Sequence, residues 1–325
     1  MNNNVTFTTS TDRDEIVKLL KDVGIIVMRD HGMSLSQYND FLLDVGYHQH
    51  PKVWCAHKEF PIFWRVNNQP VDDKGHEGLF GKHDIDWHSN ILYTQDSHEV
   101  VCIYGHKIPT GSGDCSPTTY SNTVPYFKTL PKNVQDRYKK LYTKWTYDEN
   151  KTMENRDINL HRAGLDGEAL AGEAEDTSDE NLNHQINENA KTQSIFNAVN
   201  FDPSNKHLFK KGRHQYEGYN RLVPNHPVGA EGLFFNYLNI EDIVDENYEP
   251  VPDAREIFET LKQDLLIDDT YHYVHEWQET DIVIADQLTG VHRRDHGVPD
   301  SVERELLRAT FWYKTQDRIH YDYSL

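Results

Sequence analysis

The sequence is short of cysteine, of positive charge and of long apolar runs. Only Cys55, Cys102 and Cys115 occur in 325 residues, and no two of them form a Cys-x-x-Cys pair. An odd and sparse set of thiols is typical of a reducing compartment and argues against a disulfide framework. No apolar run approaches the roughly eighteen residues of a membrane-spanning helix, and the first residues carry no signal segment. We therefore expect a cytoplasmic protein with no membrane partner.

The charge balance narrows the class of partner. The chain has 33 Lys and Arg against 53 Asp and Glu, which gives a formal net charge of −20. Such a charge opposes binding to a polyanion, so we expect no nucleic-acid partner. The length suits one large β-rich domain over residues 1–325, and no repeat of fixed period is visible.

Local patterns predict a β-rich α+β protein with flanking helices. Helices are expected from Asp12 to Gly24, over Leu35–Val45, and from Pro131 through Tyr142. Short strands dense in β-branched or aromatic residues are expected at residues 25–29, 100–104, 233–235, 282–285 and 308–313.

One segment differs in composition from the rest. From Asp148 to about Asn200 the chain is rich in Asp, Glu and Asn and poor in large apolar residues, so it cannot bury enough surface to order itself. The segment is interpreted as a solvated surface insertion. A lid over an active site is the alternative, because long loops in enzymes often close over substrate.

The run Trp87-His88-Ser89-Asn90 resembles half of an iron site with one ligand changed. Non-haem Fe(II) oxygenases hold the metal with two histidines and a carboxylate, commonly as His-x-Asp plus a distant His. His88 and Asn90 are two apart, so both would project from one face at the start of a strand. Asn90 offers a neutral amide oxygen, which is a weaker ligand than a carboxylate.

Two arginines downstream could line one cavity. Arg304 and Arg308 are four apart, so in a strand they share a face, and their rigid guanidinium forks suit carboxylate and sulfonate groups. Pairing with Glu303 and Glu305 on a helix is the alternative. The following Ala-Thr-Phe-Trp-Tyr run favours a strand.

These motifs together resemble a known family. Trp87-His88-Ser89-Asn90, Gly113-Asp114, the run from Thr118 to Asn122, Asp286-x5-His292 and Arg304-x3-Arg308-Ala309-Thr310 follow the order found in the taurine dioxygenase family of Fe(II)/2-oxoglutarate oxygenases. Residues 24–29 look like its opening strand and 232–236 like its central strand. The resemblance implies a double-stranded β-helix, a jelly-roll relative of the cupins, with the metal at one mouth. It also implies Fe(II), 2-oxoglutarate and O2, used to hydroxylate a small molecule.

The resemblance assigns the metal ligands. His88 and His292 match the iron histidines, although His296 competes with His292, and Asn90 stands where the carboxylate belongs.

It also assigns the co-substrate residues. Arg304 would pair with the distal carboxylate of 2-oxoglutarate, helped by the hydroxyl of Thr118, and Thr119 or Cys115 would take that place in a different alignment.

The substrate residues follow in the same way. Arg308 matches the arginine that meets an anionic group of the substrate, and Asp84 falls where a substrate-contacting side chain lies. Together they would suit a small zwitterion such as an amino acid or an aminosulfonate. The alternative is that Asp84 is simply a solvated residue of a charged turn, with no role in substrate binding. Homo-oligomer formation is left open.

Asn90 allows three interpretations. In the first, Asn90 is a working catalytic component of an iron site that still hydroxylates. In the second, Asn90 leaves room for chloride at the iron, as in related iron halogenases. In the third, the chain is a binding or regulatory protein without turnover. A different carboxylate could also complete the site: Asp86 lies two residues before His88, whereas Asp84 and Asp286 are more remote.

Overall fold

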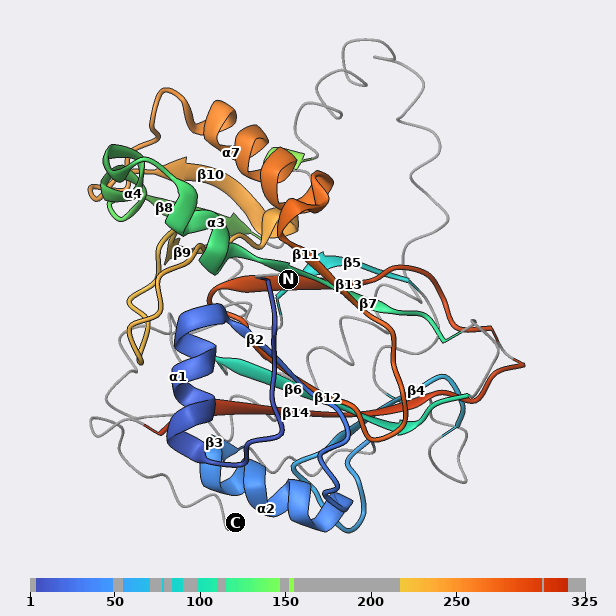
Figure 1. Cartoon of the computed structure of the whole chain (residues 1–325). Helices are drawn as coiled ribbons and strands as arrows, with labels where there is room; N and C mark the ends of the chain where they lie inside the picture. Colours follow the sequence, from blue (N-terminus) through green and yellow to red (C-terminus); the bar gives the residue numbers. More distant parts are fainter. Residues whose placement is uncertain are drawn as a thin grey trace, which may run out of the picture.

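The computed structural model describes residues 4–48, 55–70, 78, 84–89, 99–109, 115–146, 152–154, 217–299 and 301–314. Its described strands fall into three sheets, and the helices lie outside them (Figure 1). The expected β-rich mixed class is therefore confirmed. The acidic segment predicted at 148–200 lies outside the described residues apart from 152–154, so the insertion and the lid both stay predictions.

The two N-terminal helices form where the sequence predicts them, because each has an apolar face and a start signal. Asp12 caps α1 (Arg13–Val23), and Gly24 ends it with a φ of 86°, a left-handed conformation that suits glycine. Ser34 opens α2 (Leu35–Val45) with a capping box. The buried faces of both helices pack on one face of the first sheet.

The first sheet has the order β1-β2-β12-β6-β14-β3, and β4 also pairs with β14. Its strands are β1 (Thr6–Phe7), β2 (Ile25–Met28), β3 (Gly46–His48), β4 (Trp64–Asn67), β6 (Val100–Lys107), β12 (Ile282–Asp286) and β14 (Glu305–Tyr313). β2 and β12 are buried along their whole length, which explains their unbroken apolar sequences. The strands predicted at 25–29, 100–104, 282–285 and 308–313 are confirmed.

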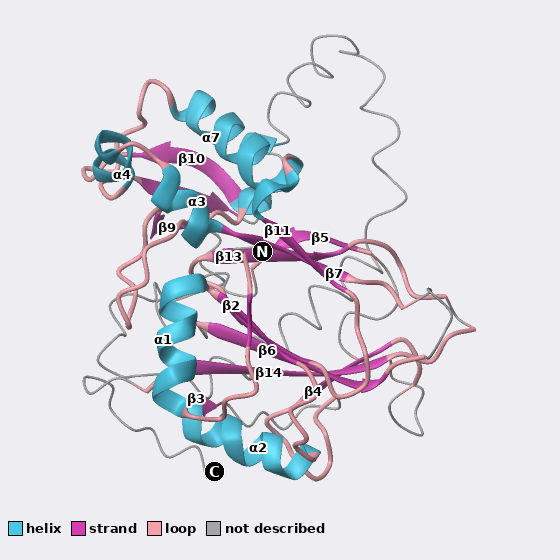
Figure 2. Cartoon of the chain, viewed as in Figure 1, coloured by secondary structure: helices cyan, strands magenta, loops and turns pink. Residues whose placement is uncertain are grey.

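The second sheet has four strands in the order β11-β7-β13-β5 and faces the first (Figure 2). They are β5 (Ile85–His88), β7 (Thr118–Asn122), β11 (His272–His275) and β13 (Gly290–Arg294). Apolar side chains of both sheets, among them Ile103, Leu306 and Tyr120, form one core between them. From β5 onward the chain passes back and forth between these two sheets, except for three strands between β7 and β11, which form a third: β6, β12 and β14 join the first sheet, and β7, β11 and β13 join the second.

The third sheet packs against the opposite side of the second sheet. It is antiparallel, with the order β10-β8-β9, and consists of β8 (Tyr142–Thr146), β9 (Glu217–Arg221) and β10 (Ile240–Val244). The helices beside it are α3 (Thr123–Thr129), α4 (Lys132–Tyr138) and α7 (Ala254–Lys262), which continues into the π-helical turn Gln263–Ile267. Trp87 of β5 and Val291 of β13 belong to the same core as these elements. This layer therefore supports the strands that carry both predicted histidines.

Two local predictions were wrong. Residues 233–235 form no strand, because their backbone bonds to the Thr123 side chain and to Leu222 instead of to a ladder. The family resemblance also predicted a central strand at 232–236, and that prediction was wrong for the same reason. The helix expected from Pro131 through Tyr142 ends at Tyr138, since Tyr142 pairs with Arg221 and Val244 as the first residue of β8.

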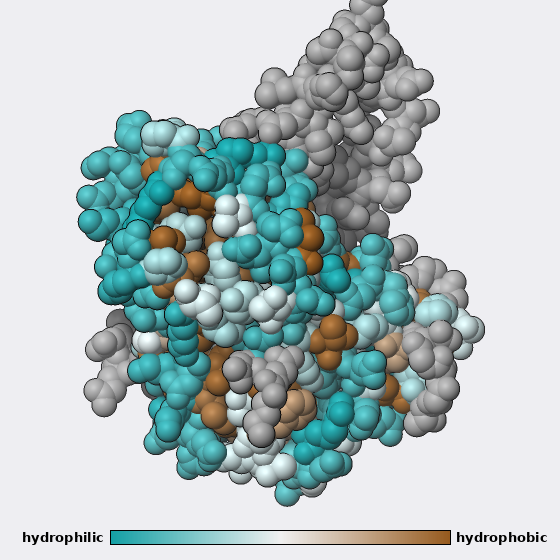
Figure 3. Space-filling view, turned by 45° about the horizontal axis from the view of Figure 1, so that its top comes forward, coloured by the Kyte–Doolittle hydropathy of each residue, from teal (hydrophilic) through white to brown (hydrophobic). Residues whose placement is uncertain are grey.

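The described surface is mostly hydrophilic on the face drawn in Figure 3, with small apolar patches between the polar residues. None of the described helices combines the length and the apolar character that crossing a bilayer would require.

Candidate active site

The two predicted metal histidines lie directly opposite each other on neighbouring strands. His88 is the last residue of β5, and His292 is the central residue of β13, with which β5 pairs antiparallel. Their ring centroids are 4.3 Å apart. The sequence placed His88 at the start of a strand, but the described strand ends there. Cross-strand pairing, which no local pattern reveals, brings the two imidazoles together.

A bulge beside this pair decides which residues of β5 face the histidines. The register pairs His292 with His88 and Arg294 with Ile85, so three steps along β5 match two along β13. The bulge breaks the strict alternation of side chains that the Asp86 hypothesis required. Asp86 accepts hydrogen bonds from the Tyr237 hydroxyl at 2.6 Å and from the following backbone N–H at 2.7 Å.

The electrostatics of the pair favour neutral imidazoles. Burial lowers the pKa of His88 to about 4, and the positive charge of Arg308 and Arg294 lowers it further. Burial likewise lowers the pKa of His292 well below its ordinary value. The Nδ1 of His88 lies 2.7 Å from the Asp86 carbonyl oxygen. Because a carbonyl only accepts, Nδ1 carries the proton and Nε2 is the nitrogen able to bind a metal.

The described residues bring together two imidazoles that could bind a metal, without a third side chain of the kinds that commonly do so. Among them, no group of three or more His, Cys, Asp or Glu side chains is placed to hold an ion. The hypotheses that Asp84, Asp86 or Asp286 completes the site are therefore not supported by this part of the chain. Asn90 lies outside the described residues, and its role stays a prediction. Two neutral imidazoles on one face fit two positions of a metal centre.

One cavity contains most of the predicted site. Its enclosed volume is about 40 Å³, within about 430 Å³ of atom-free space that is partly open to solvent. Five predicted site residues line it: His88, Thr118, His292, Arg304 and Arg308. The other described lining residues are Val66, Ile85, Ile103, Arg293, Arg294 and Leu306. The cavity thus has apolar walls, two imidazoles and a cluster of guanidinium groups.

Thr118 and Thr119 face opposite sides of β7. Thr118 lines the cavity, and its Oγ1 accepts a hydrogen bond from the Trp277 indole at 3.0 Å, so its O–H can donate to another acceptor. Thr119 donates its hydroxyl to Asp295. Of the two threonines, Thr118 therefore has the geometry for a bound carboxylate.

Arg304 is anchored beside Thr118. Its side chain is almost fully buried, and one Nη donates to the Ser116 carbonyl at 3.2 Å. Its buried Nε has no hydrogen-bond partner among the described residues. Cys115, the alternative to Thr118, lies near this guanidinium, and burial raises the pKa of its thiol. A buried N–H without an acceptor in the described part of the chain is available to a bound acceptor.

Arg308 and Arg294 extend the positive wall. Arg308 belongs to β14, so the helical alternative for this pair was wrong, and its guanidinium lies 5.4 Å from the centre of the Trp64 ring. Burial lowers the pKa of Arg308 and of Arg294 to about 10. The sequence reasoning missed Arg294. Its signal was its spacing of two from His292, which places both on one face of a strand.

Two predicted or competing residues lie elsewhere. Asp84 is exposed before β5 and is not among the described lining residues. His296 is exposed, with its Nδ1 at 3.0 Å from the Gly297 carbonyl, and it does not compete with His292 for the cavity.

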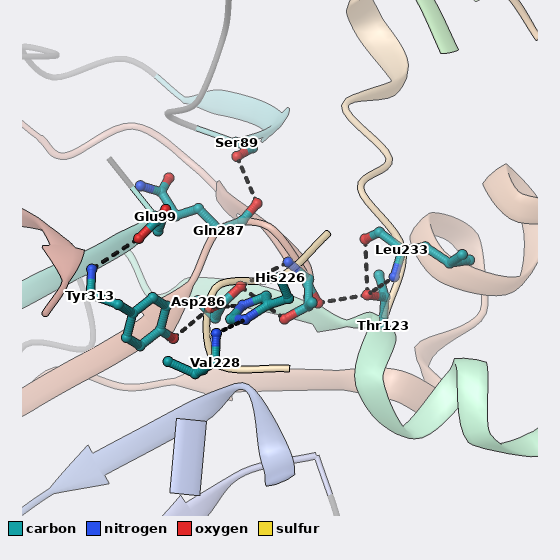
Figure 4. Close-up of polar contacts among 10 residues, drawn as sticks. Ser89, Glu99, Thr123, His226, Val228, Leu233, Asp286, Gln287 and Tyr313 are labelled. Atoms are coloured by element: carbon teal, nitrogen blue, oxygen red, sulfur yellow. Dashed lines mark hydrogen bonds and ion pairs between the residues drawn. The ribbon is translucent and has the colours of Figure 1, made fainter. Parts of the chain in front are cut away.

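A buried polar network supports the turn that leads to His292 (Figure 4). Asp286 accepts hydrogen bonds from the Tyr313 hydroxyl at 2.6 Å and from His226 Nε2 at 2.7 Å. The Ser89 hydroxyl donates to the Gln287 carbonyl at 3.1 Å. Asp286, which the sequence singled out by its spacing from His292, therefore holds the end of β12 in place.

Comparison with known proteins agrees with this geometry. A sequence model of the family described as taurine catabolism dioxygenase TauD, TfdA family matches residues 2–310. No curated protein matches the chain by sequence. At the identities given below, the similarity to solved structures shows the fold alone.

Three solved structures illustrate that fold. AAD-2 in complex with Mn(II) and N-oxalylglycine has a TM-score of 0.54 at 16% identity, over 97% of this chain and 92% of that one. A taurine dioxygenase from Burkholderia xenovorans has 0.54 at 11%, over 92% and 79%. A Burkholderia xenovorans protein assigned as an alpha-ketoglutarate dependent 2,4-D dioxygenase has 0.50 at 16%, over 96% and 90%.

Proposed function

The chain belongs to the taurine catabolism dioxygenase TauD, TfdA family, and from that premise we propose that it is an Fe(II)/2-oxoglutarate-dependent oxygenase that hydroxylates a small anionic substrate. The single observation that carries the proposal is the shared cavity. His88 is far in sequence from His292 and Arg304, yet all three line the same space.

The strand order supports a double-stranded β-helix as the framework. Apart from β8–β10, which form the third sheet, the strands from β5 to β14 are distributed between two facing sheets, as in a jelly roll. We treat residues 1–325 as one oxygenase domain of this kind, with the acidic segment as an insertion.

His88 and His292 would hold Fe(II), and Asn90 would stand at the third position. Bound iron would supply the activation of O2 that an unactivated C–H bond requires. The chain's own part is to keep both imidazoles neutral and correctly turned, which burial and the contact of His88 with the Asp86 carbonyl favour.

Arg304 and Thr118 would bind the distal carboxylate of 2-oxoglutarate (alpha-ketoglutarate). The Arg304 guanidinium offers a buried N–H, and the Thr118 hydroxyl can donate because the Trp277 indole already donates to its oxygen. Charge-assisted hydrogen bonds of this kind are the strong ones.

Arg308 would meet the acidic group of the substrate. It lines the same cavity as Arg304, and the nearby Val66, Ile103 and Leu306 would shield a small apolar body from water. Because Asp84 is exposed, we propose an anionic substrate in place of the zwitterion that Asp84 suggested. We also propose a cytoplasmic location, supported by the three free cysteines.

Anaerobic titration of the Fe(II)-loaded protein with 2-oxoglutarate tests the proposal. We expect a metal-to-ligand absorption band that saturates with 2-oxoglutarate. The Arg304→Met variant should bind Fe(II) as the wild type does and lose most of its affinity for 2-oxoglutarate. Equal loss of both affinities would contradict the role of Arg304, and absence of metal-dependent binding by the wild type would leave a non-catalytic binding protein.

A further inference from the structure

Arg294 lies on the face of β13 that carries His292. The register places it opposite Thr118 of β7 and Ile85 of β5. Residues two apart on a strand share a face, so Arg294 follows His292 one step deeper along the cavity wall. Arg294 is buried and lines the cavity. The side chain therefore starts beside the threonine whose hydroxyl can donate to a carboxylate.

Arg304 reaches the same region from the other sheet. It stands just before β14, and its Nη bonds to the carbonyl of Ser116, two residues before Thr118. Its Nε is buried with no acceptor within the described part of the chain. One end of the cavity is thus bounded by a guanidinium from each sheet and by a hydroxyl between them.

We propose that Arg294 is a second binding residue for the distal carboxylate of 2-oxoglutarate, acting together with Arg304 and Thr118. This role rests on the function proposed above and deepens it. A carboxylate has two oxygens and about four lone-pair sites, enough to accept from two guanidinium groups and a hydroxyl. The pocket then selects 2-oxo acids that carry a second carboxylate.

The neighbouring Arg293 also borders the cavity, but other side chains engage its guanidinium. Arg293 turns its guanidinium to the other face of β13, where its Nε lies 2.7 Å from Asp295 and its Cζ lies 4.6 Å from the centre of the Trp87 ring. Thr119, opposite Arg293 in the register, also bonds to Asp295. The Arg293 guanidinium is therefore engaged by Asp295 and Trp87, although residue 293 also borders the cavity.

The test compares two 2-oxo acids that differ at the far end. 2-Oxoglutarate and pyruvate share the 2-oxo acid group, but pyruvate has no distal carboxylate. Each is titrated anaerobically into Fe(II)-loaded protein, with the dissociation constant as the readout. Arg294→Met should weaken 2-oxoglutarate binding about ten- to a hundredfold, the loss of one charged hydrogen-bonding partner, and leave pyruvate binding unchanged.

Two further variants separate charge from fold. Arg294→Lys keeps the charge without the fork and should fall between the wild type and Arg294→Met. Arg137→Met removes an exposed arginine, paired with Asp253 far along the chain, and should leave both affinities unchanged. A cooperative thermal unfolding transition, measured for each variant, shows that the variant is folded.

The possible failures are distinguishable. If the wild type binds 2-oxoglutarate and Arg294→Met binds it equally well, the role of Arg294 is overturned while the proposed function stands. Equal weakening of pyruvate and 2-oxoglutarate would also overturn it, because the loss would then lie at the metal end. If the wild type binds no 2-oxoglutarate, the proposed function itself fails.

Discussion

The Ser89 hydroxyl donates a hydrogen bond to the backbone carbonyl of Gln287 at 3.1 Å. Ser89 directly follows His88, and Gln287 lies in the turn between β12 and β13 that leads to His292. Ser89 is fully buried, and its backbone N–H also donates to the Asn236 side chain at 3.3 Å. The residue between two predicted metal ligands thus joins the strand ends that carry the histidines.

Ser89→Ala should therefore weaken metal binding. Loss of one buried hydrogen bond costs about 1 kcal/mol of stability, and loss of support around a metal site typically costs about tenfold or more in metal affinity. Metal titration and urea unfolding measure the two effects. Ser10→Ala, which removes an exposed bond to Glu15, is the control and should alter neither. Reduced stability with unchanged metal affinity would show that Ser89 only supports the fold.

Asn90→Asp should tighten Fe(II) binding by at least about tenfold, or about 1.4 kcal/mol, because a carboxylate is a stronger ligand for the ion than an amide. The variant should also change the ratio of substrate oxidation to uncoupled turnover of 2-oxoglutarate. Metal titration and product analysis measure these quantities. A large gain of activity in an otherwise inert protein would instead mark natural loss of function, and unchanged metal affinity would place residue 90 away from the metal.

Chloride and bromide should have no specific effect on the Fe(II)/2-oxoglutarate complex. Asn90 is larger than the small residues found at this position in iron halogenases, so it leaves less room for an anion. The absorption band of the anaerobic complex is recorded with each halide and with an equal concentration of a non-coordinating salt. A band shift that differs between chloride and bromide would favour the halogenase alternative.

Stability should fall in acid through Asp281. Burial of this carboxyl by itself raises its pKa, but hydrogen bonds from Arg29 and from the Gln278 backbone N–H, with His275 Nε2 nearby at 3.3 Å, outweigh burial and lower it to about 2. A carboxyl whose pKa is lower in the folded state stabilises the fold above its unfolded value of about 3.9, and this contribution disappears as the pH falls through about 2.

The loss should amount to about 2 kcal/mol, since the shift is close to two pKa units. Urea unfolding at several values between pH 5 and pH 2 measures it. Asp281→Asn should lower stability at pH 5 and flatten this part of the profile. Asp136→Asn should change the profile little, because solvent screens its exposed ion pair with Lys132. A profile for Asp281→Asn as steep as that of the wild type would refute the assignment.

Local sequence information predicted well wherever a signal acts between near neighbours. The cap at Asp12, the glycine at position 24 and the β-branched run at 282–285 each act within a few residues, and the structure confirms the helix and the strands they predict. The prediction failed at 233–235, where an apolar run is buried without a ladder because distant Thr123 bonds to its backbone.

The sequence by itself determined the chemistry available to the site: the two histidines, the two arginines four residues apart and an asparagine where a carboxylate is usual. Tertiary structure alone decided which of these groups meet. A hydrogen bond from distant Tyr237 engages the Asp86 carboxylate, and the pairing of β13 with β7 sets Arg294 opposite Thr118. Strand register and the facing of two sheets depend on contacts between residues far apart in the chain, so no local pattern could reveal them.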